Sequence, residues 1–472
     1  MSKKDKSRSP QTKRRVSNKR LPVQLMERIN ANAAGIDCGA THHYVAVPED
    51  RDDEPVRHFK TFTDDLHALA DWLLHCDVDS VAIESTGTYW IALYEILQAR
   101  GLDVTLVNAR HVKNVPGRKS DVSDCQWLQW LHTVGLLRAS FRPDAEIVSL
   151  RVYLRHRQTL VEGASDHIRR MQKAMVQMNL HLHNVLSDIT GVSGLRIIRD
   201  IVAGIHDPVQ LAQHRDRRCR ATIEEVQASL TGHYREEYLF ALRQSLELYD
   251  IHQRQMQTCD EHIESLLQDL AASVPEPEPP TAPARRGRRK VSANAPTFDL
   301  RERLYQLTGG VDLTRIDAIG PYAALRLISE IGTDMSRWPS EKHFTSWLTL
   351  APQNKITGGR VLSSRTPRSA NRAAAVLRMC VMSLIRSNTA LGAFYRRVAY
   401  RTGKAKALTA TARKLAILVY RALSGTLVYE DPGAEAYEQQ HKARVLATLR
   451  KRAQRLGFAL VLDDAPQSAS VS

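Results

Sequence analysis

Four carboxylates stand where a small α/β domain would bring them together. Asp37 ends the run AAGID, Glu84 ends the run SVAIE, and Asp121 and Asp124 lie three residues apart in SDVSD. Clustered carboxylates repel one another unless a hard cation neutralises them, and Mg²⁺ takes one or two carboxylates while leaving positions for phosphate oxygens. Two such ions about 4 Å apart stabilise the attacking and leaving oxygens of a phosphodiester exchange. The residue types therefore point to metal-dependent phosphodiester chemistry.

Apolar periodicity predicts the elements that would position these acids. Residues 34–48 predict a β-hairpin whose first strand ends at Asp37. The other predicted elements are strands at 58–62, 80–84 and 103–107, and helices at 66–74, 88–100 and 120–137. Acids at the ends of neighbouring strands converge at one edge of a sheet, and Asp121 and Asp124 would share a helix face there. Taken singly, Asp121 more often caps a helix and Glu84 is more often a solvated acid.

Three segments of the N-terminal third resemble a known family. GIDCGATHHYVAV, AIESTGTYW and VNARHVKNVPGRKSDVSDCQWLQWLHTVGLLRASFRP are similar to the three blocks of the DEDD insertion-sequence transposases, relatives of the Piv-type DNA invertases. The resemblance implies a RuvC-like (RNase H) domain whose four acids are Asp37, Glu84, Asp121 and Asp124. It implies an α/β plus α fold class, with a central helical coiled coil and a mostly helical C-terminal transposase domain.

A second resemblance to the same family covers residues 312–380. LTRIDAIGPYAALRLISEI has the pattern of two short helices around Gly320, where helix N–H groups could hold a DNA phosphate; a packed helical pair is an equal alternative. In WLTLAPQNKITGGRVLSSRTPRSANRAAAVLRM the family's nucleophilic serine falls on Thr357. Around it lie basic residues suited to phosphate contact, namely Lys355, Arg360, Arg365, Arg368 and Arg372.

Thr357 departs from the family pattern. A threonine hydroxyl can perform the same displacement, although its β-branch restricts χ1 and crowds the attack. Ser363 and Ser364 are the alternative nucleophiles, but their spacing from the Gly-Gly pair differs from that of the family's serine. A threonine before Gly-Gly more commonly serves only the turn.

The composition suits an enzyme that binds a polyanion. The 472 residues carry a formal net charge of +16, and residues 3–20 form a strongly basic arm. Six cysteines without CxxC spacing predict neither a zinc site nor a disulfide framework. The sequence has no span of about 18 apolar residues and no signal-peptide core. These features predict a cytoplasmic, nucleoid-associated bacterial protein without a membrane partner.

The middle of the chain has long helical patterns. A helix from about 144 to 184 carries the stripe Ile168, Met171, Met175, Met178, Leu182 and Val185, and a second helix covers 235–272. The two stripes could pack as a hairpin within one chain or pair between chains; the resemblance favours the second. The predicted divisions are a basic arm (1–31), RuvC-like domain (32–143), coiled-coil region (144–272) with a helical insertion (187–234), linker (273–298), transposase domain (299–432) and tail (433–472).

The insertion and a later basic cluster have open interpretations. The insertion ends near Arg215, Arg217, Arg218 and Arg220 and is interpreted as an RNA- or DNA-contacting element. The cluster of Arg396, Arg397, Arg401, Lys404 and Lys406 is either an exposed helix face or the lining of a DNA channel.

Together these features predict a Mg²⁺-dependent DNA recombinase. The family resemblance implies that its hydroxyl would form a covalent link to DNA and that a bridge RNA from the element's noncoding region would guide it. Because the acids and the hydroxyl lie in different predicted domains, we expect the active site to be completed between subunits of a homodimer that assembles to a tetramer. Two alternatives remain at this point. One is a RuvC-like nuclease that hydrolyses junction DNA with the same acids, and the other is an inactive nucleic-acid-binding relative. Intact acids argue against the inactive relative.

Overall fold

The structure, a computed structural model, describes residues 27–85, 87–108, 121–278, 294–368 and 370–461; of residues 121–123 it describes only the backbone. The chain divides between Arg142 and Pro143 into two compact units. The predicted basic residues 3–20 lie outside the described residues, as do most of the predicted linker and the last eleven residues of the predicted tail.

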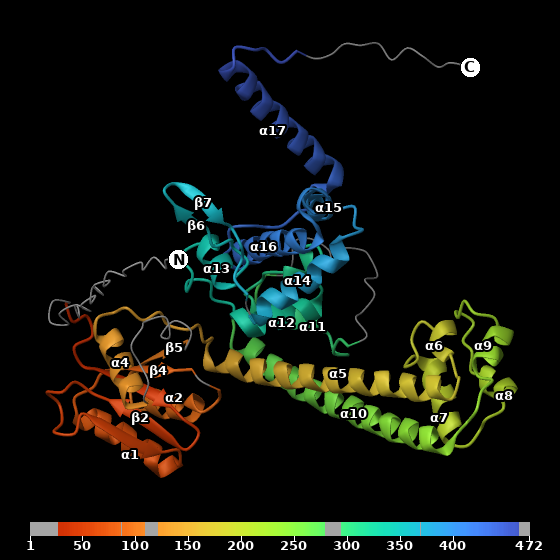
Figure 1. Cartoon of the computed structure of the whole chain (residues 1–472), viewed down its shortest axis with the longest axis horizontal. Helices are drawn as coiled ribbons and strands as arrows, with labels where there is room; N and C mark the ends of the chain where they lie inside the picture. Colours follow the sequence, from red (N-terminus) through yellow and green to blue (C-terminus); the bar gives the residue numbers. More distant parts are fainter. Residues whose placement is uncertain (1–26, 86, 109–120, 279–293, 369, 462–472) are drawn as a thin grey trace, which may run out of the picture. The chain divides into compact units, whose positions relative to one another are not determined.

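The first unit contains a five-stranded mixed sheet with the order β3-β2-β1-β4-β5 (Figure 1). The first three strands pair antiparallel, and β4 and β5 then continue parallel to β1. Their bounds are β1 Ala33–Cys38, β2 His42–Ala46, β3 Val56–Lys60, β4 Ser80–Glu84 and β5 Asp103–Val107. β4 is buried along its whole length, because it lies between two strands and under helices on both faces. The predicted strands are all present.

Helices cover the two faces of this sheet unequally. On one face, α1 (Thr63–His75) and α2 (Trp90–Ala99) pack on Ile36 and Ile83. On the other face lies α4 (Asp121–Thr133), whose Leu128 and Leu131 contact Ala82 and Val107. Burial of these aliphatic side chains is the main favourable contribution to the fold of the unit.

The second unit begins with a long antiparallel helix pair, α5 (Ala145–Gln177) and α10 (Glu236–Ala272) (Figure 1). Tyr153 stacks on His262 with ring centres 5.7 Å apart, and further along α5 the His167 ring lies 5.3 Å from that of His252. Met171 and Met175 of the predicted stripe are buried here. The two stripes therefore pack on each other within one chain, not in the inter-chain pairing that the family resemblance favours.

The first helix of this pair is shorter than the sequence predicts. It ends at Gln177 instead of near residue 184, and a separate short helix, α6 (Leu182–Val185), follows. Asn179 takes a left-handed φ of 59°, and the backbone N–H of Leu180 donates to the Met175 carbonyl at 2.8 Å. Asparagine adopts this conformation more readily than most residues, and the bonding pattern is that of a Schellman motif.

Short helices close the far end of the pair. They are α6, α7 (Val192–Val202), α8 (Pro208–Ala212) and α9 (Ile223–Ser229). Part of the basic run predicted here serves the local structure. Arg215 donates to the carbonyls of Ala221 and Cys219, and Arg218 pairs with Asp216 at 3.0 Å. The predicted nucleic-acid role of this insertion stays a prediction.

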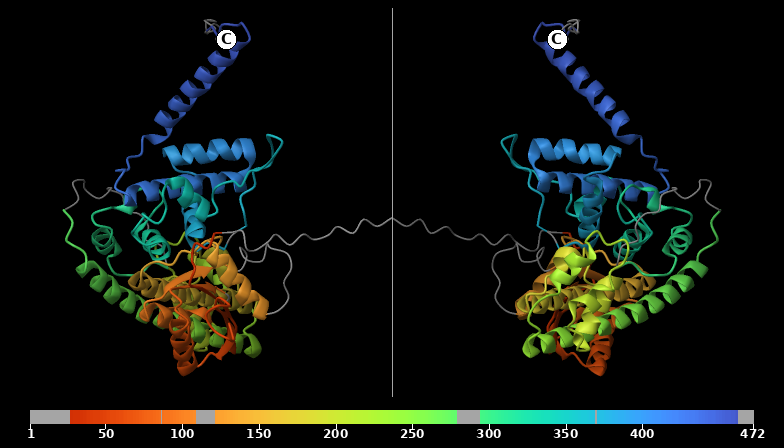
Figure 2. Two further views of the ribbon diagram at one scale, coloured as in Figure 1. Left: turned by 90° about the vertical axis from the view of Figure 1, so that its left-hand side faces the viewer. Right: turned by 90° about the vertical axis from the view of Figure 1, so that its right-hand side faces the viewer.

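The remainder of the second unit is mostly helical. Its elements are α11 (Leu300–Leu307), η2 (Leu313–Arg315), α12 (Pro321–Ile331), α13 (Glu341–Trp347), β6 (Lys355–Thr357), β7 (Arg360–Ser363), α14 (Arg372–Leu384), α15 (Ala390–Thr402), α16 (Lys404–Leu423) and α17 (Gly433–Arg455). Residues 433–472, predicted as a tail, thus begin with a helix of 23 residues that projects from the bundle (Figures 1 and 2). None of the described helices has the length and apolar character needed to cross a membrane.

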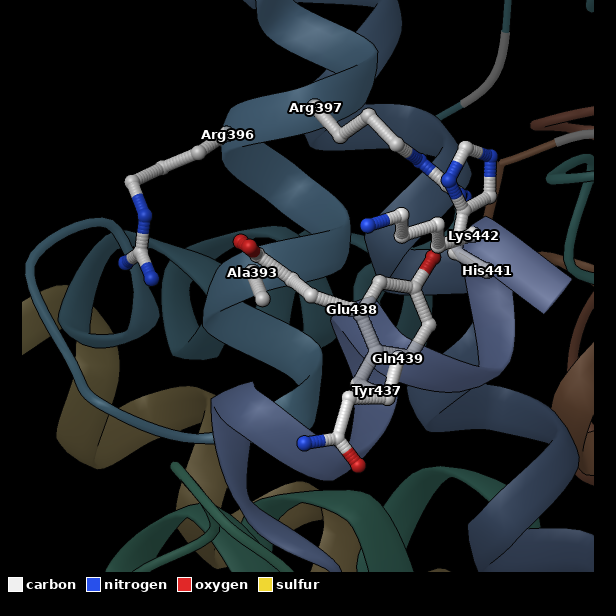
Figure 3. Close-up of a pocket in the computed structure, with 8 residues that line it drawn as sticks. All are labelled: Ala393, Arg396, Arg397, Tyr437, Glu438, Gln439, His441 and Lys442. Carbon is white, nitrogen blue, oxygen red and sulfur yellow. The ribbon is translucent and has the colours of Figure 1, made fainter. Parts of the chain in front are cut away.

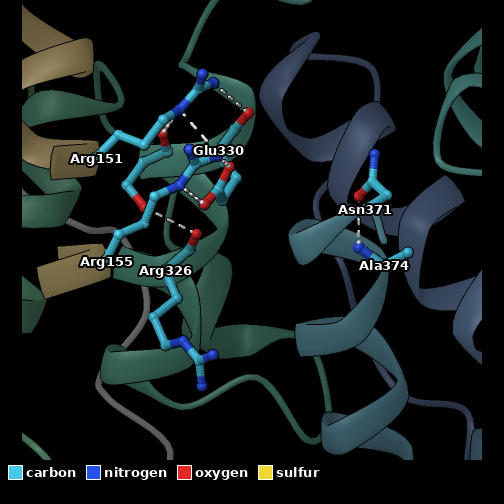
Figure 4. A network of polar contacts seen from close by, with 7 residues as sticks. Arg151, Arg155, Arg326, Glu330, Asn371 and Ala374 are labelled. Atoms are coloured by element: carbon cyan, nitrogen blue, oxygen red, sulfur yellow. Dashed lines mark hydrogen bonds and ion pairs between the residues drawn. The ribbon is translucent and has the colours of Figure 1, made fainter. Parts of the chain in front are cut away.

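Two arginines of α5 attach the C-terminal helices to the long pair (Figure 4). Arg151 donates to the backbone carbonyls of Ser329 and Glu330 at 3.0 and 2.9 Å. Arg155 forms a bidentate pair with the Glu330 carboxylate at 2.9 and 2.7 Å. These cations lie at the last turn of α12, where carbonyl groups lack helical partners and the helix dipole favours positive charge. In the same view Asn371 caps α14 by accepting from the Ala374 N–H at 2.9 Å.

Candidate active site

Asp37 and Glu84 occupy equivalent positions on neighbouring parallel strands. β1 and β4 are in register with Ile36 opposite Ile83, so the next residue of each strand is an acid. Adjacent strands lie about 4.8 Å apart. Because Ile36 and Ile83 point towards α1 and α2, alternation directs the two carboxylates to the opposite face, which α4 covers. Glu84 is 7% exposed.

The helix α4 runs antiparallel to β1 and β4. Near its C-terminal end, the Thr133 carbonyl accepts from the Ile29 N–H at 2.8 Å, just before β1 begins. His132 Nε2 lies 2.6 Å from the Ser80 hydroxyl at the start of β4. The first turn of α4 therefore lies at the other edge, where Asp37 is the last residue but one of β1 and Glu84 is the last residue of β4. Asp124 is half-buried in that turn.

A glycine allows the helix to approach this closely. A Cβ on Gly35 would lie 2.2 Å from the backbone N of Gln129 and 2.4 Å from the carbonyl O of Cys125. No side chain fits between β1 and α4 at this point. Gly35 thus sets the height of α4 above the sheet, and with it the position of the acidic first turn.

The pKa values of two cysteines, Cys38 and Cys125, reflect the burial and the negative charge at this edge of the sheet. Burial raises the pKa of Cys38, and the negative charges of Asp37 and Glu84 raise it further. Burial also raises the pKa of Cys125 to about 12, with a smaller contribution from Asp37. Both thiols stay protonated at neutral pH, because ionising them would add negative charge to a buried acidic site. They are poor metal ligands in this state, since the thiolate is the ligand form.

The donor chemistry at this edge fits a hard divalent cation. With the thiols protonated, carboxylate oxygens are the donors, and such oxygens suit Mg²⁺ and similar ions. Among the side chains that the structure describes, no group of three or more His, Cys, Asp and Glu is arranged to hold a metal ion. Asp121 is the first residue of α4, and its side chain is not among those described.

The residue predicted as nucleophile lies in the second unit. Thr357 ends β6 and pairs with Arg360 across a two-residue hairpin turn. Gly358 and Gly359 have φ of 53° and 76°, the positive values that a type I′ turn requires at both positions. Thr357 is exposed at the end of this hairpin. Ser363 lies at the base of the hairpin opposite Lys355, and Ser364 follows it.

The predicted basic residues surround this hairpin on its surface. All five are exposed, and within the described part of the chain none of them forms an ion pair: Lys355, Arg360, Arg365, Arg368 and Arg372. The hairpin also exposes Ile356, Val361 and Leu362, which are 60%, 57% and 69% accessible. A pair of strands of three and four residues that exposes both charges and apolar groups is typical of a surface that binds a partner.

The predicted helical pair around Gly320 is only partly present. Gly320 is the N-cap of α12, followed by Pro321 at the first helical position. Its predicted partner helix is a single 3₁₀ turn, η2, instead of an α-helix. Asp317 in the connection is buried, and its carboxylate accepts from the Tyr429 hydroxyl at 2.9 Å. This carboxylate stabilises the connection in a packed arrangement, which suits the alternative interpretation of the motif.

Two family models match the chain. Residues 34–180 match the DEDD transposase model, which is described as "Transposase". Residues 312–396 match the model described as "Transposase IS116/IS110/IS902 family". The chain belongs to the DEDD transposases of insertion sequences. It is accordingly a DNA-cleaving and recombining enzyme, and DNA is its partner. A comparison with curated proteins gave no match.

The two matched segments of the transposase contain different sets of its predicted site residues. The first contains all four acids, and the second contains Gly320, Thr357 and the basic residues around the hairpin. Neither segment reaches α16 or α17. Beyond Lys404 and Lys406 at the start of α16, the sequence suggested no role for residues of these helices such as Lys414 and Arg444. The available signal was the stretch from His441 to Arg455, which contains no acid.

Proposed function

We propose that this transposase exchanges DNA strands through a covalent threonine–DNA link, with Asp37, Glu84, Asp121 and Asp124 as the metal-binding acids. The observation that carries the proposal is the meeting of two strand-end acids with the first turn of α4 at one sheet edge. The sheet order, three antiparallel strands continued by two parallel ones, supports a RuvC-like (RNase H) fold for the first unit.

Mg²⁺ bound by these acids would stabilise negative charge on the reacting phosphate. The Thr357 hydroxyl attacks phosphorus, forming a P–Oγ bond while the bond from phosphorus to the 3′-oxygen breaks. The hydroxyl proton ends on the released 3′-oxygen. In the second step a 3′-hydroxyl from another strand attacks the threonine-linked phosphate, and the threonine recovers its proton. Each step exchanges one phosphodiester for another, so no external energy source is required.

The acids and the hydroxyl belong to different units of the chain. We propose that the acids of one subunit act with Thr357 of another, in a homodimer that assembles to a tetramer. The exposed apolar residues of the β6–β7 hairpin support this, because a partner surface would cover them. A bridge RNA from the element's noncoding region is the proposed guide. The exposed cations around the hairpin suit RNA as well as DNA phosphates.

The test of the nucleophile is a protein–DNA adduct. The transposase is incubated with Mg²⁺, the element's flanking RNA and end-joined DNA, and covalent adducts are separated under denaturing conditions. We expect an adduct that is absent from Thr357→Ala and present in Ser363→Ala and Ser364→Ala. An adduct that survives in Thr357→Ala but disappears in one of the serine variants would reassign the nucleophile.

The test of the acids uses Asp121→Asn. This isosteric change removes a charge at the start of α4, so we expect strand exchange to be lost while RNA and DNA binding is largely retained. Retained exchange would contradict the metal-site assignment. DNA cleavage without any adduct would instead favour the alternative function, a nuclease in which water attacks the phosphate.

A further inference from the structure

A cavity of about 480 Å³ lies between α15 and α17. Most of the residues that line it lie outside the two segments that match the family models. Arg396, Arg397, His441 and Lys442 line it together with Tyr437 and Glu438 (Figure 3). Three of these six side chains are cationic, His441 can gain a proton, and only Glu438 is acidic. The cavity is therefore chemically suited to an anion.

Two cations beside the cavity share the same aromatic rings. The Arg397 guanidinium lies 5.7 Å from the ring centre of Phe394 and 5.1 Å from that of Tyr437. The Lys414 ammonium lies 4.4 and 5.9 Å from the same two centres. Each cation is stabilised by its cation–π contacts with the two rings, but the two positive charges repel each other. Nη1 of Arg397 is buried without a hydrogen-bond partner among the described residues.

This repulsion also affects the pKa of Lys414. Burial lowers its pKa, and the positive charges of Arg397 and Arg444 lower it further. Neither Arg397 nor Lys414 forms an ion pair with an acid of the described chain. Positive charges this close together destabilise the protein when no anion is bound, and they favour the binding of an anion that neutralises them.

The helix α17 extends this positive surface. Ala434 is its one buried residue among those described, and the helix projects from the bundle (Figures 1 and 2). From His441 onwards it contains six Lys or Arg and no acid: Lys442, Arg444, Arg450, Lys451, Arg452 and Arg455. At about 1.5 Å per residue, its 23 residues span about 35 Å, close to one turn of duplex DNA.

We infer that the cavity and the basic half of α17, together the α15–α17 surface, bind the phosphate backbone of duplex DNA at a place separate from the reacting phosphate. Charge complementarity selects this occupant. Two copies of α17 side by side would bring together twelve cations and, over that half, no acids, so self-pairing is unfavourable. Contacts of this kind fix the position of the duplex without reading its sequence.

The first experiment removes three exposed charges from α17 in the full-length protein. The variant Arg450→Gln/Lys451→Gln/Arg452→Gln is compared with a control triple of equal charge change on the long helix pair, Arg170→Gln/Lys173→Gln/Arg254→Gln. The affinity for element-end duplex DNA is measured by fluorescence anisotropy over a series of salt concentrations. Because each phosphate contact contributes about 0.9 to the slope of log affinity against log salt, we expect the α17 triple to flatten that slope by about 2.7.

Three results would overturn the inference. The first is a slope for the α17 triple equal to that of the control triple. The second is a loss confined to the element's RNA, with duplex DNA binding unchanged, since the surface would then serve RNA. The third is a change of mass by analytical ultracentrifugation at unchanged DNA affinity, because α17 would then be a self-association element. Equal effects on unrelated duplex sequences would support a backbone contact.

A second variant tests the cavity. Lys414→Met keeps a flexible side chain on the two aromatic rings and removes one of the repelling charges. We expect its melting temperature without DNA to rise, and the additional rise produced by saturating duplex DNA to shrink. A lower melting temperature together with an unchanged DNA-induced shift would show that the cations beside the cavity are not part of an anion-binding site.

Discussion

At the residue scale, the position of the acids depends on one missing side chain. Gly35 lies under the α4 backbone, so a Cβ there would force the helix away from the sheet. We expect Gly35→Ala to lower the free energy of unfolding by about 3 kcal/mol, the upper part of the range for overpacking. Urea denaturation followed by circular dichroism would measure this. Strand exchange should fall as well, because Asp124 would move with the helix.

Gly101→Ala is the matched control in the same unit. Its added Cβ would meet nothing within 4 Å, although its φ of 82° strains any other residue. The expected cost is therefore only about 1 kcal/mol. Equal losses for the two variants would mean that the close approach of α4 to β1 does not limit stability.

Also at the residue scale, the thiols beside the acids predict a loss of stability in alkali. The folded state raises the pKa of both Cys38 and Cys125, the latter to about 12, whereas an unfolded thiol titrates near about 8.5. As the pH rises, the unfolded state loses these protons first. The free energy of unfolding should therefore hold below about pH 8 and fall from there towards about pH 12.

Urea unfolding at pH 7 to 10 would check this alkaline loss. The double variant Cys38→Ala/Cys125→Ala should show a shallower decline than the unchanged protein. Cys219→Ala, which removes a half-buried thiol from the second unit, should decline as the unchanged protein does. Identical pH profiles for the double variant and the unchanged protein would contradict the prediction.

At the element scale, a buried arginine joins the two long helices. Arg157 of α5 donates to Asp260 of α10 at 2.5 and 2.9 Å, and its side chain is 3% exposed. It also donates to the Asn294 carbonyl at 2.7 Å and the Tyr322 hydroxyl at 3.1 Å. Arg157→Ala leaves the Asp260 charge without its partner, so we expect a loss of about 3 to 5 kcal/mol in the free energy of unfolding.

Arg155→Ala is the comparison on the same helix. Its bidentate pair with Glu330 is also charged, but the Arg155 side chain is 43% exposed. Water screens that pair, so the expected loss is about 1 kcal/mol or less. Chemical denaturation of both variants would rank them, and a larger loss for Arg155→Ala would contradict the assignment of Arg157 as the main link.

The β6–β7 hairpin gives a second prediction at this scale. Gly358 needs a positive φ, which asparagine tolerates and valine does not. Gly358→Asn should retain strand exchange because Asn-Gly forms the same turn. Gly358→Val should reduce the rate of exchange at least about tenfold, since left-handed strain of about 1 to 3 kcal/mol opposes the turn that holds Thr357. A quantitative exchange assay on both variants would test this, and equal rates would remove the hairpin from the mechanism.

Sequence periodicity predicted the elements of the first unit well. The strands that contain Asp37 and Glu84 near their ends are short apolar runs bounded by turn residues, and burial on a sheet enforces that pattern. The end of α5 was missed, since the apolar spacing continues past Asn179 while a local backbone motif stops the helix. The helix α17 was not predicted because it buries almost no apolar side chains. Its sequence therefore lacks the apolar periodicity that would distinguish a helix from a polar tail.

At the scale of the whole molecule, chemistry is divided between distant parts of the sequence. The acids of this edge were predictable because each lies near the end of a strand or in the first turn of a helix. The close approach of β1 to α4 was not predictable, because it depends on Gly35 contacting the backbone of Cys125 and Gln129, which lie 90 and 94 positions later in the chain. The hairpin around Thr357 is likewise a local structure that the sequence indicates. How Thr357 would reach the acids belongs to the proposed assembly of subunits, which no local pattern in a single sequence encodes.

The most direct test of a shared active site is complementation between two inactive proteins. Asp121→Asn keeps the threonine, and Thr357→Ala keeps the acids, so each alone should fail to exchange strands. If the acids of one subunit act with the threonine of another, mixed assemblies contain intact sites. We expect strand exchange to reappear when the two variants are co-assembled with the element's RNA and DNA. Mixed assemblies as inactive as each variant alone would contradict a site completed between subunits.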